Sequence, residues 1–270
     1  MLLAIDAGNT NLVFALFDNT LETGKKLASW RISTDIRRTS DEYAVWLTQL
    51  MRLKGFTPET VTAGMIASVV PPLDSQLLLL FREYFSVEPQ VVGQMSLPLQ
   101  VNIDHPQSVG ADRLVNAVAA HHYYQGPLVV VDLGTATTFD VVDEAGNYCG
   151  GVIAPGVHLS MEALHRAAAK LPKVEVAMPP RVVGRNTIHA MQSGLYWGYA
   201  GMMEGIISRI SRELALPIKV IATGGLARLY AENISIFDAV DDDLTIKGLW
   251  LLHQWGVHST NSMKDKNNVS

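Results

Sequence analysis

The chain opens with an apolar stretch, LLAIDAGNTNLVFALFD at residues 2 to 18, that is interrupted by one carboxylate, Asp6, and by the polar residues from Gly8 to Asn11. A tight hairpin turn accounts for the Gly and Asn residues, because both tolerate positive φ. It does not account for Asp6, which precedes the turn inside the first predicted strand. The stretch therefore predicts two antiparallel strands joined by a turn, and it leaves open why a carboxylate lies inside the first strand.

The same pattern occurs again almost half a chain later, in LVVVDLGTATTFDVVDEAGN at 128 to 147. The run from Val131 to Thr135 aligns with the run from Ile5 to Asn9. Continued without a gap, the alignment places three later apolar residues over three others: Phe139, Val141 and Val142 over Val13, Ala15 and Leu16. A repeat at long period indicates a duplicated unit. We expect two α/β halves, each with one acidic hairpin, and a cleft between them that holds both carboxylates.

The length of 270 residues and the repeat together favour two domains, 1–125 and 126–257, followed by a polar, disordered tail at 258–270. The formal net charge of −5 argues against a nucleic-acid partner, since phosphate backbones select clustered Lys and Arg. The apolar runs, such as Leu77 to Phe81, are too short for a membrane span of about 20 residues. Asp6 interrupts the N-terminal apolar stretch too early for that stretch to form the apolar core of a signal peptide. We expect a cytoplasmic protein in which Cys149, the single cysteine, is reduced and buried.

The local patterns alternate between strand and helix in both halves. Thr39 and Glu42 have the spacing of a capping box and predict a helix start. Asp74 is expected to cap a second helix that begins after Pro71-Pro72 ends a buried strand. Further helices are expected at Ala111 to Tyr124, about 158 to 170, Asn186 to Leu214, and Leu244 to Trp255, the last capped by Asp243.

The hairpins suggest nucleotide chemistry. Backbone N–H groups of a Gly-rich polar turn can bind phosphate oxygens, and a neighbouring carboxylate can hold a cation directly or through water. The sequence has no P-loop, because Gly24-Lys25 lacks the upstream Gly, and no Gly-x-Gly-x-x-Gly opens a helix. Thr223-Gly224-Gly225 follows an apolar strand and could let an adenosine lie against the backbone. A simple helix-entry turn is an equally open interpretation there.

These stretches together resemble the acetate and sugar kinase, Hsp70 and actin superfamily, and more closely the type III pantothenate kinases, also called the Bvg accessory factor family. The matching stretches occur in family order over residues 2 to about 253: Asp6–Thr10, Val109–Arg113 with Asn116, Val131–Thr137, Gly150–Gly156, Gly184–Thr187 and Thr223–Gly225. The resemblance implies an α/β fold of two duplicated ribonuclease-H-like (actin-like ATPase) domains with a nucleotide cleft between them. It also implies ATP-dependent phosphorylation of pantothenate to 4'-phosphopantothenate, the first step of coenzyme A biosynthesis.

The resemblance further implies a role for each matching residue. ATP would contact the first hairpin, the second hairpin and the glycine turn: Asp6, Ala7, Gly8, Asn9, Thr10, Asn11, Leu12, Val13, Thr135, Gly224 and Gly225. Asp6 would lie near magnesium, and Asp132 would bind potassium or ammonium. Pantothenate would contact the helix start and two further positions: Gly110, Ala111, Asp112, Arg113, Thr187 and Ile103. Asp112 would accept the proton of the attacking hydroxyl.

The residues around Asp112 are consistent with its role as a proton acceptor. Phosphoryl transfer to a hydroxyl needs a positioned carboxylate, and alignment and charge neutralisation supply the rest. An ordinary N-terminal carboxylate favoured by the helix dipole is the alternative. Arg113 could face the substrate carboxylate or pair with a neighbouring acid. Ile103 departs from the family, in which many members carry a Tyr that packs on the substrate; Asn102 or His105 could supply a polar contact instead.

Other interpretations stay open at this point. A kinase of another small hydroxylated substrate would use the same hairpins. A regulatory accessory factor without catalysis could keep Asp6 and Asp132 but would not need Asp112 or Arg113, and both are present. The run Asp241–Asp243 is expected to be a solvated cap rather than a metal site. Family resemblance implies a homodimer formed through the apolar region from 186 to 214.

Overall fold

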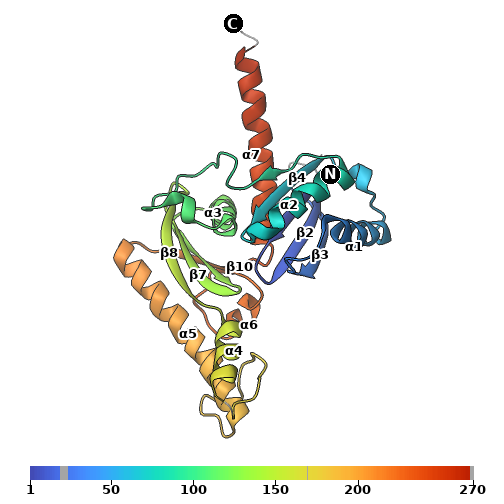
Figure 1. The fold of residues 1–270 in the computed structure, drawn as a ribbon. Coiled ribbons are helices and arrows are strands. Elements are labelled where there is room, and N and C mark those ends of the chain that lie inside the picture. Colours follow the sequence, from blue (N-terminus) through green and yellow to red (C-terminus); the bar gives the residue numbers. More distant parts are fainter. Residues whose placement is uncertain (19–23, 169, 268–270) are drawn as a thin grey trace. The chain divides into compact units, whose positions relative to one another are not determined.

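The computed structural model describes residues 1–18, 24–168 and 170–267, with backbone only from residue 258 onward. The chain forms two compact units, one of residues 1–100, 104–119 and 244–270 and one of residues 101–103 and 120–243. Each unit contains a five-stranded sheet with helices against it (Figure 1). The predicted duplicated α/β fold is confirmed. The predicted boundary at 125/126 stays a prediction.

The sheet of the first unit has the strand order β3-β2-β1-β4-β5. The first three strands are antiparallel, and β4 and β5 run parallel to β1: β1 Leu2–Ala7, β2 Asn11–Phe17, β3 Lys26–Ser33, β4 Ala63–Ser68 and β5 Gln90–Val91. One face of the sheet packs on α1 (Ser40–Leu53) and α2 (Pro71–Leu79) through residues such as Ile5, Phe14 and Tyr43. The other face packs on the start of α3 (Ala111–Tyr124) and on α7 (Leu244–Asn267) through Val115 and Leu249.

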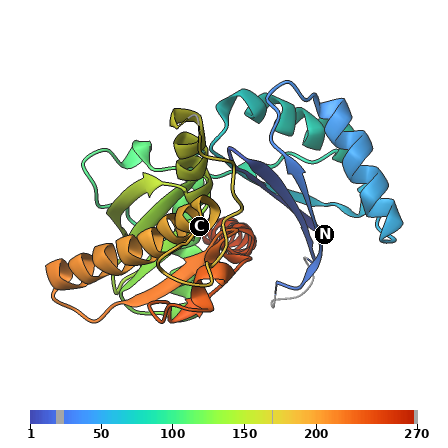
Figure 2. The ribbon, with the colours of Figure 1, turned by 90° about the horizontal axis from the view of Figure 1, so that it is seen from below.

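The second unit repeats this order as β8-β7-β6-β9-β10, with the same directions. Its strands are β6 Leu128–Leu133, β7 Ala136–Val142, β8 Tyr148–Pro155, β9 Lys219–Thr223 and β10 Ala239–Val240. Three helices cover one face of this sheet (Figure 2): α4 Val157–Ala167, α5 Thr187–Leu214 and α6 Ala227–Ala231. The core there includes Val131, Phe139 and Tyr196, all fully buried.

The two hairpins differ in turn length by one residue. Four residues separate the pair Ala7–Leu12 in the first hairpin, and three separate Leu133–Thr137 in the second. The alignment without a gap was therefore wrong after the turn: Phe139 corresponds to Phe14 rather than to Val13. With the one-residue shift, β1 and β6 share one burial pattern and β2 and β7 share another.

Helix starts followed the sequence in one case and not in another. Thr39 and Glu42 form the predicted capping box at α1. The predicted cap at Asp74 is wrong, because α2 already begins at Pro71 and Asp74 lies in its first turn. Proline suits a first helical position, where its fixed φ fits and its missing N–H is not needed. The chain continues as a π-helical turn, Leu80–Phe85.

Three further expectations concern exposure and the chain end. Cys149 is exposed, so the prediction that it is buried was wrong; the alternation of β8 buries Tyr148 and turns Cys149 outward. The predicted disordered tail at 258–270 falls on helical backbone through Asn267 and on three residues outside the described part. None of the helices among the described residues has the length and apolar character that a membrane crossing requires.

Candidate active site

The first hairpin ends in an exposed polar turn. The Gly8 N–H donates to the Asn11 carbonyl oxygen at 3.0 Å, and the side chains of Asn9 and Thr10 are exposed. Asp6 is half-buried and lies one residue before the end of β1, paired with Val13 on one side and with β4 on the other. Its carboxylate is thus held on a central strand next to an exposed polar turn of the kind that binds anions through backbone N–H groups.

The second hairpin places Asp132 between two glycine turns. The Gly134 N–H donates to the Ala136 carbonyl oxygen at 3.0 Å. A Cβ built on Gly134 would lie 3.4 Å from Asp132 Oδ1, and one built on Gly224 would lie 2.5 Å from the same oxygen. Gly224 also has a φ of +90°, which favours glycine. The Thr223-Gly224-Gly225 turn and the second hairpin therefore meet at Asp132, because β9 runs parallel to β6 with Thr223 opposite Asp132.

Asp112 lies in the first turn of α3, and its Oδ1 accepts the Arg113 N–H at 2.8 Å. Gly110 backs this carboxylate so closely that a Cβ on it would lie 2.5 Å from Asp112 Oδ1 and 3.4 Å from Val69 Cγ1. Val69 in turn donates its N–H to the Ala7 carbonyl oxygen at 3.0 Å. This chain of contacts anchors Asp112 at the carboxyl end of β1, the same edge of the sheet that carries the first hairpin.

The start of α3 is held firmly by α7. Asn116 is buried, and its Oδ1 accepts the Thr245 hydroxyl at 2.7 Å. Gly248 lets α7 approach α3 closely, because a Cβ there would lie 2.5 Å from Val115 Cγ1. The Asp112 turn therefore sits on a rigid support.

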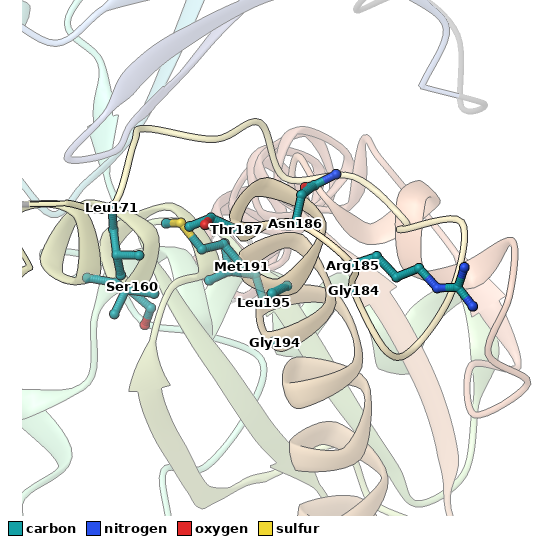
Figure 3. A pocket seen from close by; sticks show the side chains of 11 residues that line it. Ser160, Leu171, Gly184, Arg185, Asn186, Thr187, Met191, Gly194 and Leu195 are labelled. Atoms are coloured by element: carbon teal, nitrogen blue, oxygen red, sulfur yellow. The ribbon is translucent and has the colours of Figure 1, made fainter.

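Thr187 lies elsewhere in the second unit, at the first position of α5. The preceding residue, Asn186, caps this helix by accepting the His189 N–H at 2.8 Å. A pocket of about 640 Å³ opens beside it, between the ends of α4 and α5. Arg185, Thr187 and Met191 are among the residues that line this pocket, and the Arg185 side chain extends away from the other two (Figure 3).

The structure groups the predicted site residues by unit. The first unit brings together the hairpin from Asp6 to Val13 and the stretch from Gly110 to Arg113. The second brings together Asp132, Thr135 and the glycine turn. Ile103 belongs to the second unit, where its Cγ2 would lie 3.4 Å from a Cβ on Gly150.

The acidic run from Asp241 to Asp243 is structural. Asp241 is buried, which differs from the expected solvated cap, and it accepts the Tyr124 hydroxyl at 3.2 Å. Burial, followed by the charge of Asp241, raises the pKa of Tyr124 to about 12. Asp242 forms an ion pair with Arg228.

Sequence reasoning assigned no role to two residues that touch the hairpin turns, although Gly156 ends one of the stretches that carry the family resemblance. Thr34 contacts the first turn, and Gly156 contacts the second. Each lies one residue beyond the strand that pairs with the hairpin, so only the alignment of the two halves beyond the turns could have pointed to them.

Comparison with known sequences gives one consistent family. The family model of type III pantothenate kinases matches residues 2–209. A type III pantothenate kinase of Paramagnetospirillum magneticum is 55% identical over 256 residues, which cover 94% of this chain and 97% of the relative. One of Rhodospirillum centenum is 56% identical over 260 residues, covering 94% and 98%.

Comparison with solved structures supports the fold. A protein described as a Baf family transcriptional activator from Campylobacter jejuni aligns with a TM-score of 0.60 at 18% identity, covering 95% of this chain and 99% of that one. A protein described as a 2-dehydro-3-deoxygalactonokinase from Sinorhizobium meliloti aligns with a TM-score of 0.57 at 15% identity, covering 94% and 96%. At these identities the likeness concerns the fold alone.

Proposed function

The chain belongs to the type III pantothenate kinase family, and from this premise we propose how its residues phosphorylate pantothenate with ATP, the first step of coenzyme A biosynthesis. The primary hydroxyl of pantothenate attacks the γ-phosphorus of ATP. A new P–O bond forms, the bond to the β,γ-bridging oxygen breaks, and ADP leaves with that oxygen. The hydroxyl proton passes to Asp112, so that 4'-phosphopantothenate is released as the product.

The position of Asp112 carries the proposal. Its carboxylate is held by the Arg113 N–H and lies at the edge of the sheet that carries the first hairpin. A general base must be within hydrogen-bond reach of the hydroxyl, and a base on a rigid helix start can be placed accurately. Arg113, in the same turn, faces the pantothenate carboxylate in this proposal, and the positive end of the α3 helix dipole favours the same anion.

The hairpins bind the nucleotide. Asn9 to Asn11 and Thr135 offer backbone N–H groups to the phosphates, and the turn at Gly224 and Gly225 offers an open backbone to the adenosine. The support for these assignments is the duplicated geometry: two equivalent turns, each preceded by a carboxylate on a central strand. The sequence resembles the type III pantothenate kinases in these stretches, in the same order.

Asp6 and Asp132 suit cations that prefer oxygen ligands. No three His, Cys, Asp or Glu side chains gather as a metal site in the part of the chain that the structure describes. In a kinase, magnesium is held by one or two carboxylates plus substrate phosphates, and Asp6 supplies one such carboxylate in this proposal. We assign magnesium to Asp6 and potassium or ammonium to Asp132, whose Oδ1 lies against Gly134 and Gly224. When bound there, magnesium would supply charge neutralisation during phosphoryl transfer.

We also propose a cytoplasmic homodimer built on α5. The glycines Gly194, Gly198 and Gly201 recur at helical spacing, and a Cβ on any of them would meet nothing within 4 Å. Ile188 at the helix start is 50% exposed. A helix face that is open and nearly without side chains allows close packing against the same helix of a second copy. Thr187 then serves a pocket whose Asp112 belongs to the partner.

The test is a substrate panel with purified protein, magnesium and potassium. ATP is offered with pantothenate, several sugars or acetate, and ADP release and the mass of the product are recorded. Pantothenate-dependent ADP release with formation of 4'-phosphopantothenate is expected. Turnover of a sugar or acetate instead, or no turnover at all, would refute the proposed substrate.

A further inference from the structure

Thr34 holds the turn of the first hairpin from the side. It is the first residue after β3, and its backbone N–H donates to the Thr10 carbonyl oxygen at 3.0 Å. Its Oγ1 donates to the Gly8 carbonyl oxygen at 2.6 Å. One residue therefore fixes two carbonyl groups of the same turn, and it lies 26 positions from Gly8 in sequence.

Gly156 occupies the equivalent place in the second unit. It is the first residue after β8, as Thr34 is after β3, and its N–H donates to the Thr135 carbonyl oxygen at 3.1 Å. A Cβ on Gly156 would overlap the carbonyl groups of Thr135 and Gly134. The second turn, which is shorter by one residue, therefore packs directly against the Gly156 backbone, whereas the first turn is contacted by the Thr34 hydroxyl.

Fixing a carbonyl group also fixes an N–H group. In a trans peptide the C=O and the following N–H point in opposite directions. Because Thr34 holds the carbonyls of Gly8 and Thr10, the N–H groups of Asn9 and Asn11 are directed away from Thr34. Anion binding by a turn depends on the direction of such N–H groups.

We propose that Thr34 is a positioning residue for ATP, which sets the direction of the N–H groups in the first phosphate hairpin, and that Gly156 does the same for the second hairpin by its lack of a side chain. This inference rests on the proposed nucleotide role of the hairpins. Thr34 itself touches the turn and not the reacting atoms, so its loss should weaken the use of ATP without affecting the use of pantothenate.

The experiment compares Thr34→Val, which removes the hydroxyl and keeps the N–H, with Thr34→Ser, which keeps both. Thr60→Val is the matched control, because the Thr60 hydroxyl also donates to a backbone carbonyl, that of Thr57, at 2.6 Å, and Thr60 precedes β4 rather than following a strand end. Steady-state kinetics are measured with ATP and with pantothenate as the varied substrate. Binding of ADP alone is measured by calorimetry, and melting temperatures are recorded.

Thr34→Val should lower kcat/KM for ATP by about 2- to 12-fold, the factor that corresponds to one net hydrogen bond. ADP binding should weaken by a similar factor, the KM for pantothenate should stay constant, and Thr34→Ser should restore both ATP parameters. Gly156→Ala should weaken ADP binding further, because its Cβ displaces the second turn. Thr60→Val should change the melting temperature as much as Thr34→Val does, but it should leave the ATP kinetics and ADP binding at wild-type values.

The outcomes separate this inference from the proposed function. Wild-type protein that binds ADP but does not phosphorylate pantothenate would refute the substrate, and the binding data would still decide the role of Thr34. Wild-type ATP kinetics and ADP binding in Thr34→Val would overturn the inference, as would equal losses for ATP and pantothenate or no rescue by Thr34→Ser. Wild-type protein that binds no nucleotide would overturn both.

Discussion

Replacing Gly110 by alanine should displace the Asp112 carboxylate, which we propose as the general base, while leaving the fold intact. The new Cβ would lie 2.5 Å from Asp112 Oδ1, whereas ordinary contacts begin at 3.4 Å. The carboxylate must therefore retreat by about 0.9 Å, the difference between these two distances. A misplacement of about 1 Å at a reacting group can cost roughly 100-fold in rate. We expect kcat to fall by about that factor.

Stability should change little in this variant. Gly110 is not among the residues with positive φ, so alanine fits its backbone and lowers the entropy of the unfolded chain by about 0.4–1 kcal/mol. Loss of the hydrogen bond from the Arg113 N–H to Asp112 costs about 0.5–1.5 kcal/mol. The two contributions nearly cancel, and the melting temperature should stay within about 2–4 °C of the wild type.

The assay measures pantothenate-dependent ADP release in Gly110→Ala, Asp112→Asn and the double variant. Asp112→Asn should lose about 10²- to 10⁴-fold in kcat with nucleotide binding retained. In the double variant Gly110→Ala should add almost nothing, because the group that it displaces is already disabled. A wild-type kcat in Gly110→Ala, or a full further loss in the double variant, would refute the reasoning.

Three further predictions follow from other parts of the chain. Asp132→Ala should abolish stimulation of turnover by potassium. Equal stimulation in the variant and the wild type would show that Asp132 does not bind the cation. Mixing inactive Asp112→Asn and Thr187→Ala chains after unfolding should restore roughly a quarter of the sites, since half of randomly paired dimers are mixed and each repairs one site; no recovery despite proven subunit exchange would place both residues in one chain. His253 is 6% exposed, and burial, followed by the charge of the N-terminal ammonium, lowers its pKa. The unfolded chain therefore takes up the proton first, so the free energy of unfolding should fall as the pH drops below about 6.5, and His253→Gln should flatten this dependence in thermal melts at several pH values.

The sequence by itself determined the features that depend on neighbouring residues or on repetition. The repeat of strand, Asp, Gly and turn was enough to predict two equivalent hairpins, because apolar periodicity and turn chemistry are local. The capping box of Thr39 and Glu42 and the helix from Ala111 to Tyr124 were predicted for the same reason. The order of the matching stretches was enough to predict the family.

Only the tertiary structure decided how the turns and the carboxylates are held. The one-residue difference between the hairpins appears in strand pairing and not in composition, so the gapless alignment misplaced Phe139. The contact of Gly224, the residue after β9, with Asp132 of the neighbouring parallel strand joins positions about 90 apart in the sequence, and Thr34 reaches Gly8 across an intervening strand. Such contacts follow from strand order and register, which are fixed when the whole sheet packs, and no short stretch of sequence encodes them.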